Sequence, residues 1–331
     1  MLDFQKEKKL VLDYYKALEK TETKNISKVI TKFCKSDLIW RGFHPFNLIR
    51  GAEQVGELFW KPLFESIIHC QRRMDIFMAG NNETAGHEGT WVVSMGHLMG
   101  LFDKPWIDIP ASQKLIMLRY CEFNKIQGGK ITETAMFFDV PHFMIQAGLK
   151  PFKSQTAAHL VQPGPINHRG LMYEAQDHTE GEKTKKAIEF MINDIKSWQA
   201  SNDEPLVDEL RRSWNENMVW WGPAGIGATY TIERYAKQHS GPFRAGLKDR
   251  KFNGHLCRIA EGEFGGFFGW PNLTLTPDGF MGLPASKTPG DMRVIDIYRR
   301  EGEKLSENWI FIDLLHFWNM QGIDILRESI T

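Results

Sequence analysis

The order of apolar and polar positions along the chain predicts helices followed by strands, in two successive blocks. Residues 5–20 repeat apolar side chains at helical spacing with charges between them, which indicates an amphipathic helix. Helices are also expected from Asn25 to about Cys34 and over residues 52–67, where Pro62 predicts a kink. In the second half, residues 191–198 and 206–214 show the same pattern as the first two helices.

Alternating apolar and polar side chains, separated by Gly and Asn, predict strands in the remainder of the first block. Gln127 and the two glycines that follow are expected to form a hairpin turn between the last two strands. The strands are expected over residues 37–46 (running into a loop), 70–79, 86–95, 115–123 and 131–138.

A long segment of the chain occurs twice. Residues Ile109–Leu149 match Leu283–Ile323, 174 positions downstream, without a gap. Farther upstream, between Trp40/Trp220 and Pro62/Pro242, the offset is 180. A gap-free match of this length indicates a tandem duplication. The positions that recur include Pro-Ala-Ser (110–112 and 284–286), Arg119/Arg293, Gly128/Gly302, Phe137/Phe311, Asp139/Asp313, His142/His316 and Gly148/Gly322.

The duplication sets the expected domain organisation and fold. We expect a first domain over residues 1–150, a surface connector over 151–183 and a second domain over 184–331. The predicted class is α+β: two tandem, cone-shaped α+β barrels, each a curved antiparallel sheet with helices packed on it. The apolar interior of such a cone is a natural place for a small ligand.

Charge and cysteine content narrow the classes of partner. Lys and Arg number 41, as do Asp and Glu, so no net charge favours nucleic acid or an anionic membrane surface. No apolar run approaches the ~18–20 residues that a membrane span needs, and the charged start MLDFQKEKKL lacks the apolar region of a signal peptide. Four cysteines without Cys-x-x-Cys spacing indicate reduced thiols, so we expect a cytoplasmic protein.

Three segments of the second copy carry a resemblance to a known family. They are Gly282-Leu-Pro-Ala-Ser-Lys, the stretch from Arg300 to Gly322, and Trp220-Trp-Gly-Pro-Ala-Gly-Ile-Gly. The pattern resembles the SnoaL-like polyketide cyclases of the nuclear-transport-factor-2-like superfamily. The resemblance implies a cone fold and an intramolecular aldol reaction that uses an aspartate as acid and base, with no metal or organic cofactor. By motif position that aspartate falls on Asp139 and Asp313. The superfamily also holds isomerases, dehydratases, hydrolases and non-catalytic members.

Asp139 and Asp313 each have two interpretations from the residues alone. Each follows a strand and begins a helix that ends near a glycine, as an N-cap residue does. Alternation also places Asp139 on the strand face of Phe137, and Asp313 on that of Phe311. If that face lines the cone, desolvation would raise the carboxyl pKa toward that of a useful base. Both roles stay open.

The histidines and tryptophans supply the remaining candidates. His142 and His316 follow the aspartates by three residues, where the carboxylate could orient the imidazole or the histidine could simply pack at the helix start. Glu133 and Glu307 are expected to face Glu122 and Asp296 across the hairpin, or to be solvated or compensated by arginine. No histidine has metal-ligand spacing, so no metal site is expected. The side chains expected to shape a substrate site, besides Phe137 and Phe311, are Trp40, His44, His87 and Trp91 in the first copy and Trp220, Trp221 and Trp270 in the second.

These expectations lead to one functional hypothesis and one alternative. The hypothesis is a cofactor-independent enzyme of the lyase or isomerase type, in which an aspartate removes a proton next to the carbonyl of a small apolar compound. Product could arise by cyclisation, isomerisation or elimination. The alternative is a non-catalytic small-ligand-binding or scaffold protein whose two copies form an internal pseudo-dimer, with further homo-oligomers open.

Overall fold

The computed structural model describes residues 3–157, 163–196 and 204–328. These residues form two compact units, one for each copy of the repeat. Below, the unit that holds the first copy is called the first domain and the other the second domain. The first domain comprises the described parts of Leu2–Pro151, Ile166–Ala175 and Asp324–Thr331, and the second those of Phe152–Pro165 and Gln176–Ile323.

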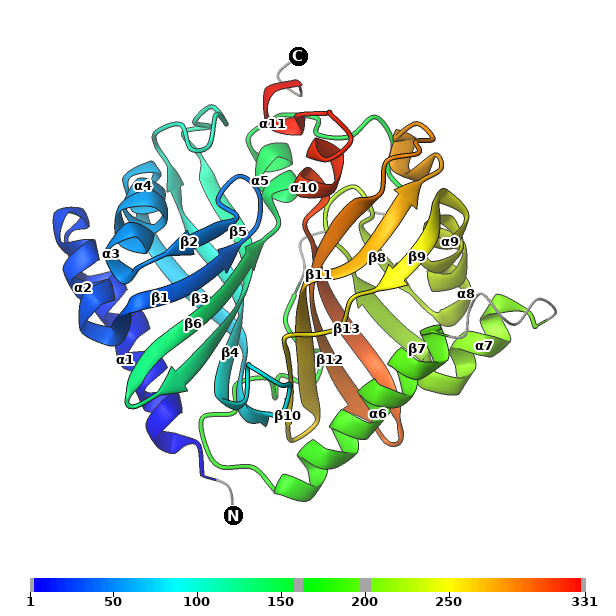
Figure 1. The fold of residues 1–331 in the computed structure, drawn as a ribbon, viewed down its shortest axis with the longest axis horizontal. Helices are drawn as coiled ribbons and strands as arrows, with labels where there is room; N and C mark the ends of the chain where they lie inside the picture. Colours follow the sequence, from blue (N-terminus) through cyan, green and yellow to red (C-terminus); the bar gives the residue numbers. More distant parts are fainter. Residues whose placement is uncertain (1–2, 158–162, 197–203, 329–331) are drawn as a thin grey trace. The chain divides into compact units, whose positions relative to one another are not determined.

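Helices cover one face of the first domain's sheet (Figure 1). The first of them buries Val11, Tyr14 and Leu18, which lie on one side at helical spacing. The helical segments are α1 (Gln5–Lys20), the 3-10 turn η1 (Thr23–Asn25), α2 (Ile26–Phe33), α3 (Ala52–Val55), the π-helical turn η2 (Gly56–Trp60), α4 (Lys61–Ser66) and α5 (Val140–Gln146), with the short α11 (Ile325–Glu328) assigned to the same unit.

The sheet of the first domain has six strands in the order β2-β1-β6-β5-β4-β3. The expected antiparallel sheet is wrong in one respect, because β1 pairs with β6 in parallel and the sheet is therefore mixed. The chain reaches β6 only after β3, β4 and β5, so this pairing joins segments that are distant in sequence. The strands are β1 (Cys34–Gly42), β2 (Leu48–Arg50), β3 (Ile67–Asn82), β4 (Gly89–Phe102), β5 (Leu115–Gln127) and β6 (Lys130–Phe138).

The second domain repeats this arrangement, with β13 and β7 as its parallel pair. Its strand order is β10-β11-β12-β13-β7-β8, and β9 pairs with β11. The helical segments are α6 (His178–Lys196), α7 (Leu206–Ser213), α8 (Ile232–Tyr235), the π-helical turn η3 (Ala236–Ser240), α9 (Gly241–Gly246), η4 (Phe280–Gly282) and α10 (Leu314–Asn319). The strands are β7 (Trp214–Trp221), β8 (Ala228–Tyr230), β9 (Leu247–Phe252), β10 (Cys257–Glu261), β11 (Phe264–Pro277), β12 (Gly290–Glu301) and β13 (Lys304–Ile312).

The α+β class and the two tandem domains are confirmed. Equivalent elements keep the offsets seen in the sequence: η2 and η3 lie 180 residues apart, and β6 and β13 lie 174 apart. The expected barrel is wrong, since within the described residues each sheet is an open path of strands. Helix α6 begins at His178, earlier than the pattern from residue 191 indicated, and Thr184 anchors this part by donating a hydrogen bond to the Gly262 carbonyl (2.7 Å).

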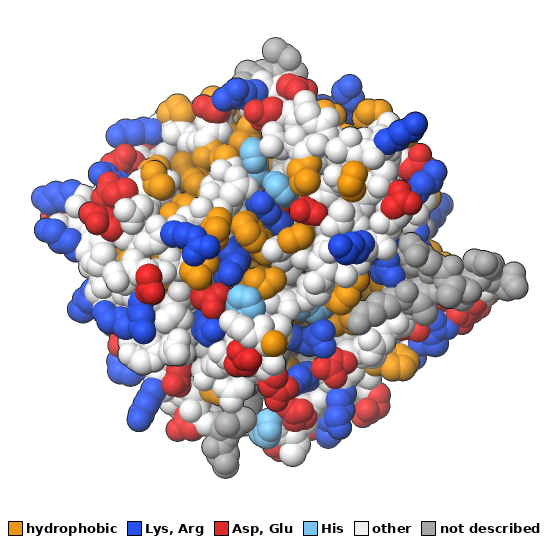
Figure 2. Space-filling model, in the orientation of Figure 1, with side chains coloured by type: hydrophobic (Ala, Val, Ile, Leu, Met, Phe, Trp, Pro, Cys, Tyr) orange, Lys and Arg blue, Asp and Glu red, His pale blue; other side chains and the backbone are white. Residues whose placement is uncertain are grey.

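Two features of the surface and the helices bear on possible partners. Positive and negative side chains are interspersed over the face shown in Figure 2. Across the described ranges, every helix is too short or too polar to cross a membrane.

Candidate functional site

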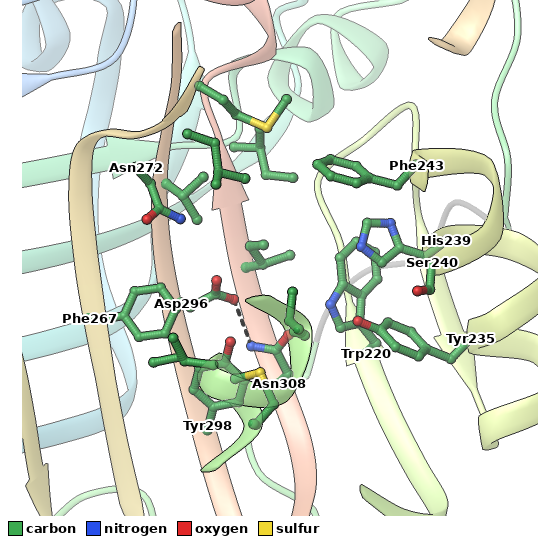
Figure 3. Close-up of a pocket in the computed structure, with 18 of the residues that line it drawn as sticks. Trp220, Tyr235, His239, Ser240, Phe243, Phe267, Asn272, Asp296, Tyr298 and Asn308 are labelled. Carbon is green, nitrogen blue, oxygen red and sulfur yellow. Dashed lines mark hydrogen bonds between the residues drawn. The ribbon is translucent and has the colours of Figure 1, made fainter. Parts of the chain in front are cut away.

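A cavity lies between the helices and the sheet of the second domain. Its volume is about 140 Å³, close to the ~150 Å³ that holds a benzene-sized ligand in other proteins. Most of the lining is apolar or aromatic, from α6, α7, α8, η3, α9 and the strands β7, β9, β11, β12 and β13. The labelled polar side chains in Figure 3 are Tyr235, His239, Ser240, Asn272, Asp296, Tyr298 and Asn308.

Strand β13 presents its even-numbered side chains to this cavity. Asn308, Ile310 and Ile312 line the wall, and because side chains alternate along a strand, Phe311 belongs to the opposite face. In the first domain, the even-numbered side chains of β6 likewise face the helices: Phe138 stacks on Phe59 of the helical turn η2, with ring centroids 5.2 Å apart. The face expected to line the cone was therefore the wrong one.

Asp296 supplies a carboxylate to the cavity from the neighbouring strand β12. Asn308 donates an amide hydrogen bond to one carboxylate oxygen (Nδ2–Oδ1 2.9 Å), drawn as a dashed line in Figure 3. Asp296 is 5% exposed. Burial raises the pKa of Tyr298 well above its usual value, and the charge of Asp296 and a hydrogen bond to it add to that shift. Asn308 and Tyr298 thus solvate the carboxylate in place of water.

His239 forms part of the opposite wall, stacked on Trp220 (Figure 3). The ring centroids are 3.8 Å apart and the planes 20° from parallel. Burial, together with the nearby charge of Arg244, lowers the pKa of His239 to about 3. Its imidazole is therefore neutral at ordinary pH.

Two arginines stand at the same cavity. Arg244 makes a bidentate ion pair with Glu209 (Nη1–Oε2 2.8 Å and Nη2–Oε1 2.5 Å), which fixes the orientation of its guanidinium. Burial lowers the pKa of Arg250, which also lines the cavity.

In the first domain, a side chain of the protein fills the equivalent space. Glu122 is the counterpart of Asp296, and Arg72 pairs with it (Nη1–Oε2 2.8 Å). The Arg72 guanidinium lies over the Tyr15 ring at 3.7 Å and the Tyr120 ring at 4.4 Å. Only 4% of the Arg72 side chain is exposed. The two copies have thus diverged, one toward a buried ion pair and the other toward a cavity.

The same divergence appears in the π-helical turns. With the offset of 180, Phe59 and Trp60 of the first domain become His239 and Ser240 of the second. Trp60 is fully buried and lies near Arg72, whose guanidinium is 5.6 Å from its ring centroid. Replacing this indole by the small Ser240 side chain removes volume from the interior, which leaves room for the cavity.

Asp139 and Asp313 lie at the starts of α5 and α10 and act as N-caps. Asp139 accepts a hydrogen bond from the backbone N–H of His142 (3.0 Å), and Asp313 from that of His316 (3.2 Å). The N-cap interpretation is confirmed. Asp313 also accepts a hydrogen bond from Arg293 (Nη1–Oδ2 3.3 Å), and its side chain is 1% exposed. Neither Asp313 nor His316 lines the cavity. Their catalytic role stays a prediction.

Of the side chains expected to shape a substrate site, Trp220 is the one that lines this cavity. Trp40 packs on Phe59 in the first domain's core, with ring centroids 4.7 Å apart. The other expected side chains lie elsewhere. In the first domain, Phe137 stacks on Phe43, His87 forms a hydrogen bond with Glu133, the Trp91 indole donates a hydrogen bond to the His87 carbonyl, and His44 precedes a cis Pro45. In the second domain, Trp270 packs against the Arg293 guanidinium, and neither Trp221 nor Phe311 lines the cavity.

The expected acidic pairs across the hairpins are wrong. Glu133 lies opposite Lys125 and Glu307 opposite Arg299, and each glutamate forms an ion pair with its partner. Compensation by arginine, the other possibility, is confirmed for both glutamates, since Glu133 also pairs with Arg41 (Nη1–Oε2 2.8 Å) and Glu307 pairs with Arg299. Among the described residues, no three His, Cys, Asp or Glu side chains gather in a way that could hold a metal ion.

Sequence reasoning missed Asp296, Asn308 and His239. Asp296 and Asn308 were visible as polar residues in apolar strands, but an isolated polar residue gives no indication of the face on which it lies. The replacement of Phe59 by His239 was the stronger signal, because it introduces nitrogens at a position that the first copy fills with a hydrocarbon ring.

Comparisons with known proteins give similarities at low sequence identity. No family model matches the chain, and no curated protein does. Solved structures that match include a SnoaL-like polyketide cyclase from Jannaschia sp. CCS1 (17% identity, TM-score 0.33, 43% of this chain and 93% of that one). Others are an NTF2-like protein from Burkholderia thailandensis E264 (17%, 0.32, 43% and 95%) and TsrD from Streptomyces laurentii (16%, 0.35, 45% and 98%). Each match spans nearly all of the other protein but under half of this chain.

Proposed function

We propose that the second domain binds a small, largely apolar carbonyl compound in its cavity and catalyses acid–base chemistry on it without a cofactor. Asp296 is the base in this proposal. The observation that carries it is a buried carboxylate, held by the Asn308 amide, at the wall of a largely apolar cavity. Carboxylates in such surroundings are common general bases.

The proposed step is removal of a proton from the carbon next to the carbonyl. The C–H bond breaks, the proton moves to a carboxylate oxygen of Asp296, and the electron pair shifts to the carbonyl oxygen to give an enolate. Asp296 can then return the proton to the same carbon or a different one. A second carbonyl or a leaving group in the substrate would instead lead to cyclisation or elimination.

The second domain is the better candidate for this chemistry. In the first domain Glu122 already holds a cation, Arg72, at 2.8 Å, and that guanidinium occupies the space a substrate would need. A carboxylate neutralised by a fixed guanidinium is a weak base. The size of the second cavity favours substrates of about one ring.

Proton exchange tests the proposal without knowledge of the natural substrate. Full-length protein is incubated in D₂O with small ketones such as cyclohexanone and phenylacetone, and loss of the α-hydrogen signal is followed by NMR. We expect wild type to accelerate exchange of at least one ketone, and Asp296→Asn to slow it by roughly 100-fold or more. Asp313→Asn is the matched control and should change the rate by less than about threefold.

Each other outcome has a defined meaning. If Asp313→Asn abolishes exchange and Asp296→Asn does not, the base is the residue that the sequence resemblance indicated. If wild type binds the ketones but leaves their exchange at the rate in buffer, the cavity is a binding site without this chemistry, and the proposal fails.

A further inference from the structure

We propose that His239 donates a hydrogen bond to the carbonyl oxygen of the ligand and so completes the site that Asp296 begins. The inference rests on the proposed function and adds the group that receives the developing negative charge. It also narrows the substrate class to compounds in which a carbonyl oxygen and an acidic C–H can lie on opposite sides of a single ring-sized space.

His239 lies in the wall of the cavity. It stands in the π-helical turn η3, a helix variant that is frequent at functional sites. Figure 3 shows it on one side of the cavity with Trp220, and Asp296 on the other side. Trp220 stacks on one face of the imidazole, and the Tyr235 ring centroid lies 5.4 Å from that of His239. These two rings limit the movement of the imidazole.

His239 has an unfilled hydrogen-bonding capacity. It lines the cavity and is 9% exposed, and its Nδ1 is buried without a hydrogen-bond partner among the described residues. Buried polar atoms in folded proteins nearly always have a partner, so an unpartnered nitrogen on a ring that lines a cavity indicates a ligand. A neutral imidazole has one N–H to donate and one nitrogen to accept, and rotation of the ring by half a turn exchanges their places.

The first domain has a hydrocarbon ring where the second has His239. Phe59 stands at the equivalent position and packs on Trp40, with the rings tilted by 34°, whereas His239 stacks on Trp220. Packing alone is therefore satisfied by a hydrocarbon ring at this site. The two nitrogens add hydrogen bonding to the same shape, in the copy that has the cavity.

The charge of the imidazole suits this role. Arg244 is the charged group near His239, and it is already paired with Glu209. A neutral donor strengthens its hydrogen bond as charge develops on the oxygen, without giving up its own proton. In the proposed step the proton therefore goes to Asp296 alone, and the His239 N–H stays on its nitrogen.

A phenolate serves as a stable analogue of the enolate, and 4-nitrophenol is the probe. Its visible absorption reports both the ionised fraction and hydrogen bonding to the oxygen. We expect wild-type protein to bind it, and His239→Phe, which carries the first domain's own residue, to weaken binding of the phenolate by about tenfold. His239→Gln keeps an N–H donor and should retain binding within about threefold. The absorption band of the bound phenolate should also shift in His239→Phe and less in His239→Gln.

The same titration with Asp296→Asn separates this inference from the proposed function. A neutral amide resembles the protonated acid that follows proton transfer, so we expect the phenolate to bind more tightly to this variant. Equal binding by wild type and His239→Phe overturns the role of His239, as does a lack of binding to wild type. If His239→Phe weakens binding but Asp296→Asn does not strengthen it, His239 stands and the assignment of Asp296 fails.

Discussion

The buried ion pair of the first domain offers a test of how this copy is stabilised. Arg72 and Glu122 are 4% and 1% exposed, 2.8 Å apart. Burial by itself would lower the pKa of Arg72, but the charges of Tyr120 and Glu122 raise it above its usual value. Arg72→Met leaves the Glu122 carboxylate buried without its cation. Breaking such a pair costs about 3–5 kcal/mol of unfolding free energy.

Replacing both partners should cost far less. Arg72→Met combined with Glu122→Leu removes both charges and keeps apolar volume, and exchanges of this kind are often close to neutral. The coupling energy of the double-mutant cycle should therefore be about 3 kcal/mol or more in favour of the pair.

Hydrogen exchange measured by mass spectrometry on the full chain provides the assay. Peptides from β3 and β5 report the local stability of the first domain apart from the second. Arg73→Met, at the exposed neighbouring position, is the control and should be within about 0.5 kcal/mol of wild type. The reasoning is refuted if Arg72→Met costs less than about 1 kcal/mol, or if the two single costs simply add in the double variant.

Two further predictions concern the second domain. Asp313→Ala should lower the domain's unfolding free energy by about 1–2 kcal/mol through the lost helix cap, and further because Arg293 loses its carboxylate partner. Asp313→Asn keeps the cap and should cost less. Urea unfolding in which the two variants are equally destabilised would contradict this. His239 has a folded pKa of about 3 against an ordinary 6.5, so below pH 6.5 the unfolded chain takes up a proton that the folded chain does not. The unfolding free energy should therefore fall as pH drops from about 6.5 toward 3, by up to about 1.4 kcal/mol per pH unit. His239→Phe should lack this contribution to the pH dependence. Hydrogen exchange of β12 and β13 peptides measures the difference.

The sequence was sufficient for much of the fold. The gap-free repeat located the strands and helices of both copies, because tandem copies keep the same spacing between equivalent elements. The turn at Gly128 and Gly129 was also predictable: both residues have positive φ (60° and 69°), which glycine adopts without strain. The N-cap role of the aspartates that begin α5 and α10, one of the two interpretations left open, was predictable for a similar local reason.

The site was less predictable, for two physical reasons. The central strands are buried on both faces, so apolar residues occur at odd and even positions alike and alternation does not show which face lies under the helices. The pairing of β1 with β6 and of β7 with β13 depends on segments that are distant along the chain. The cavity then arises from differences in side-chain size, such as Ser240 in place of Trp60, which become informative only once these neighbours are known.

The π-helical turn places a constraint on the length of the polypeptide. Tyr235 comes directly before the turn and Phe243 follows it, and both reach the same cavity wall. A π-helical turn accommodates one residue more than an α-helical turn, so the extra residue is absorbed and the two aromatic side chains stay on one side of the helix. An α-helix advances by about 100° per residue. Deletion of one residue that removes the π-helical turn should therefore leave Phe243 facing the cavity, whereas insertion of one residue into the same segment should turn everything downstream by roughly that angle.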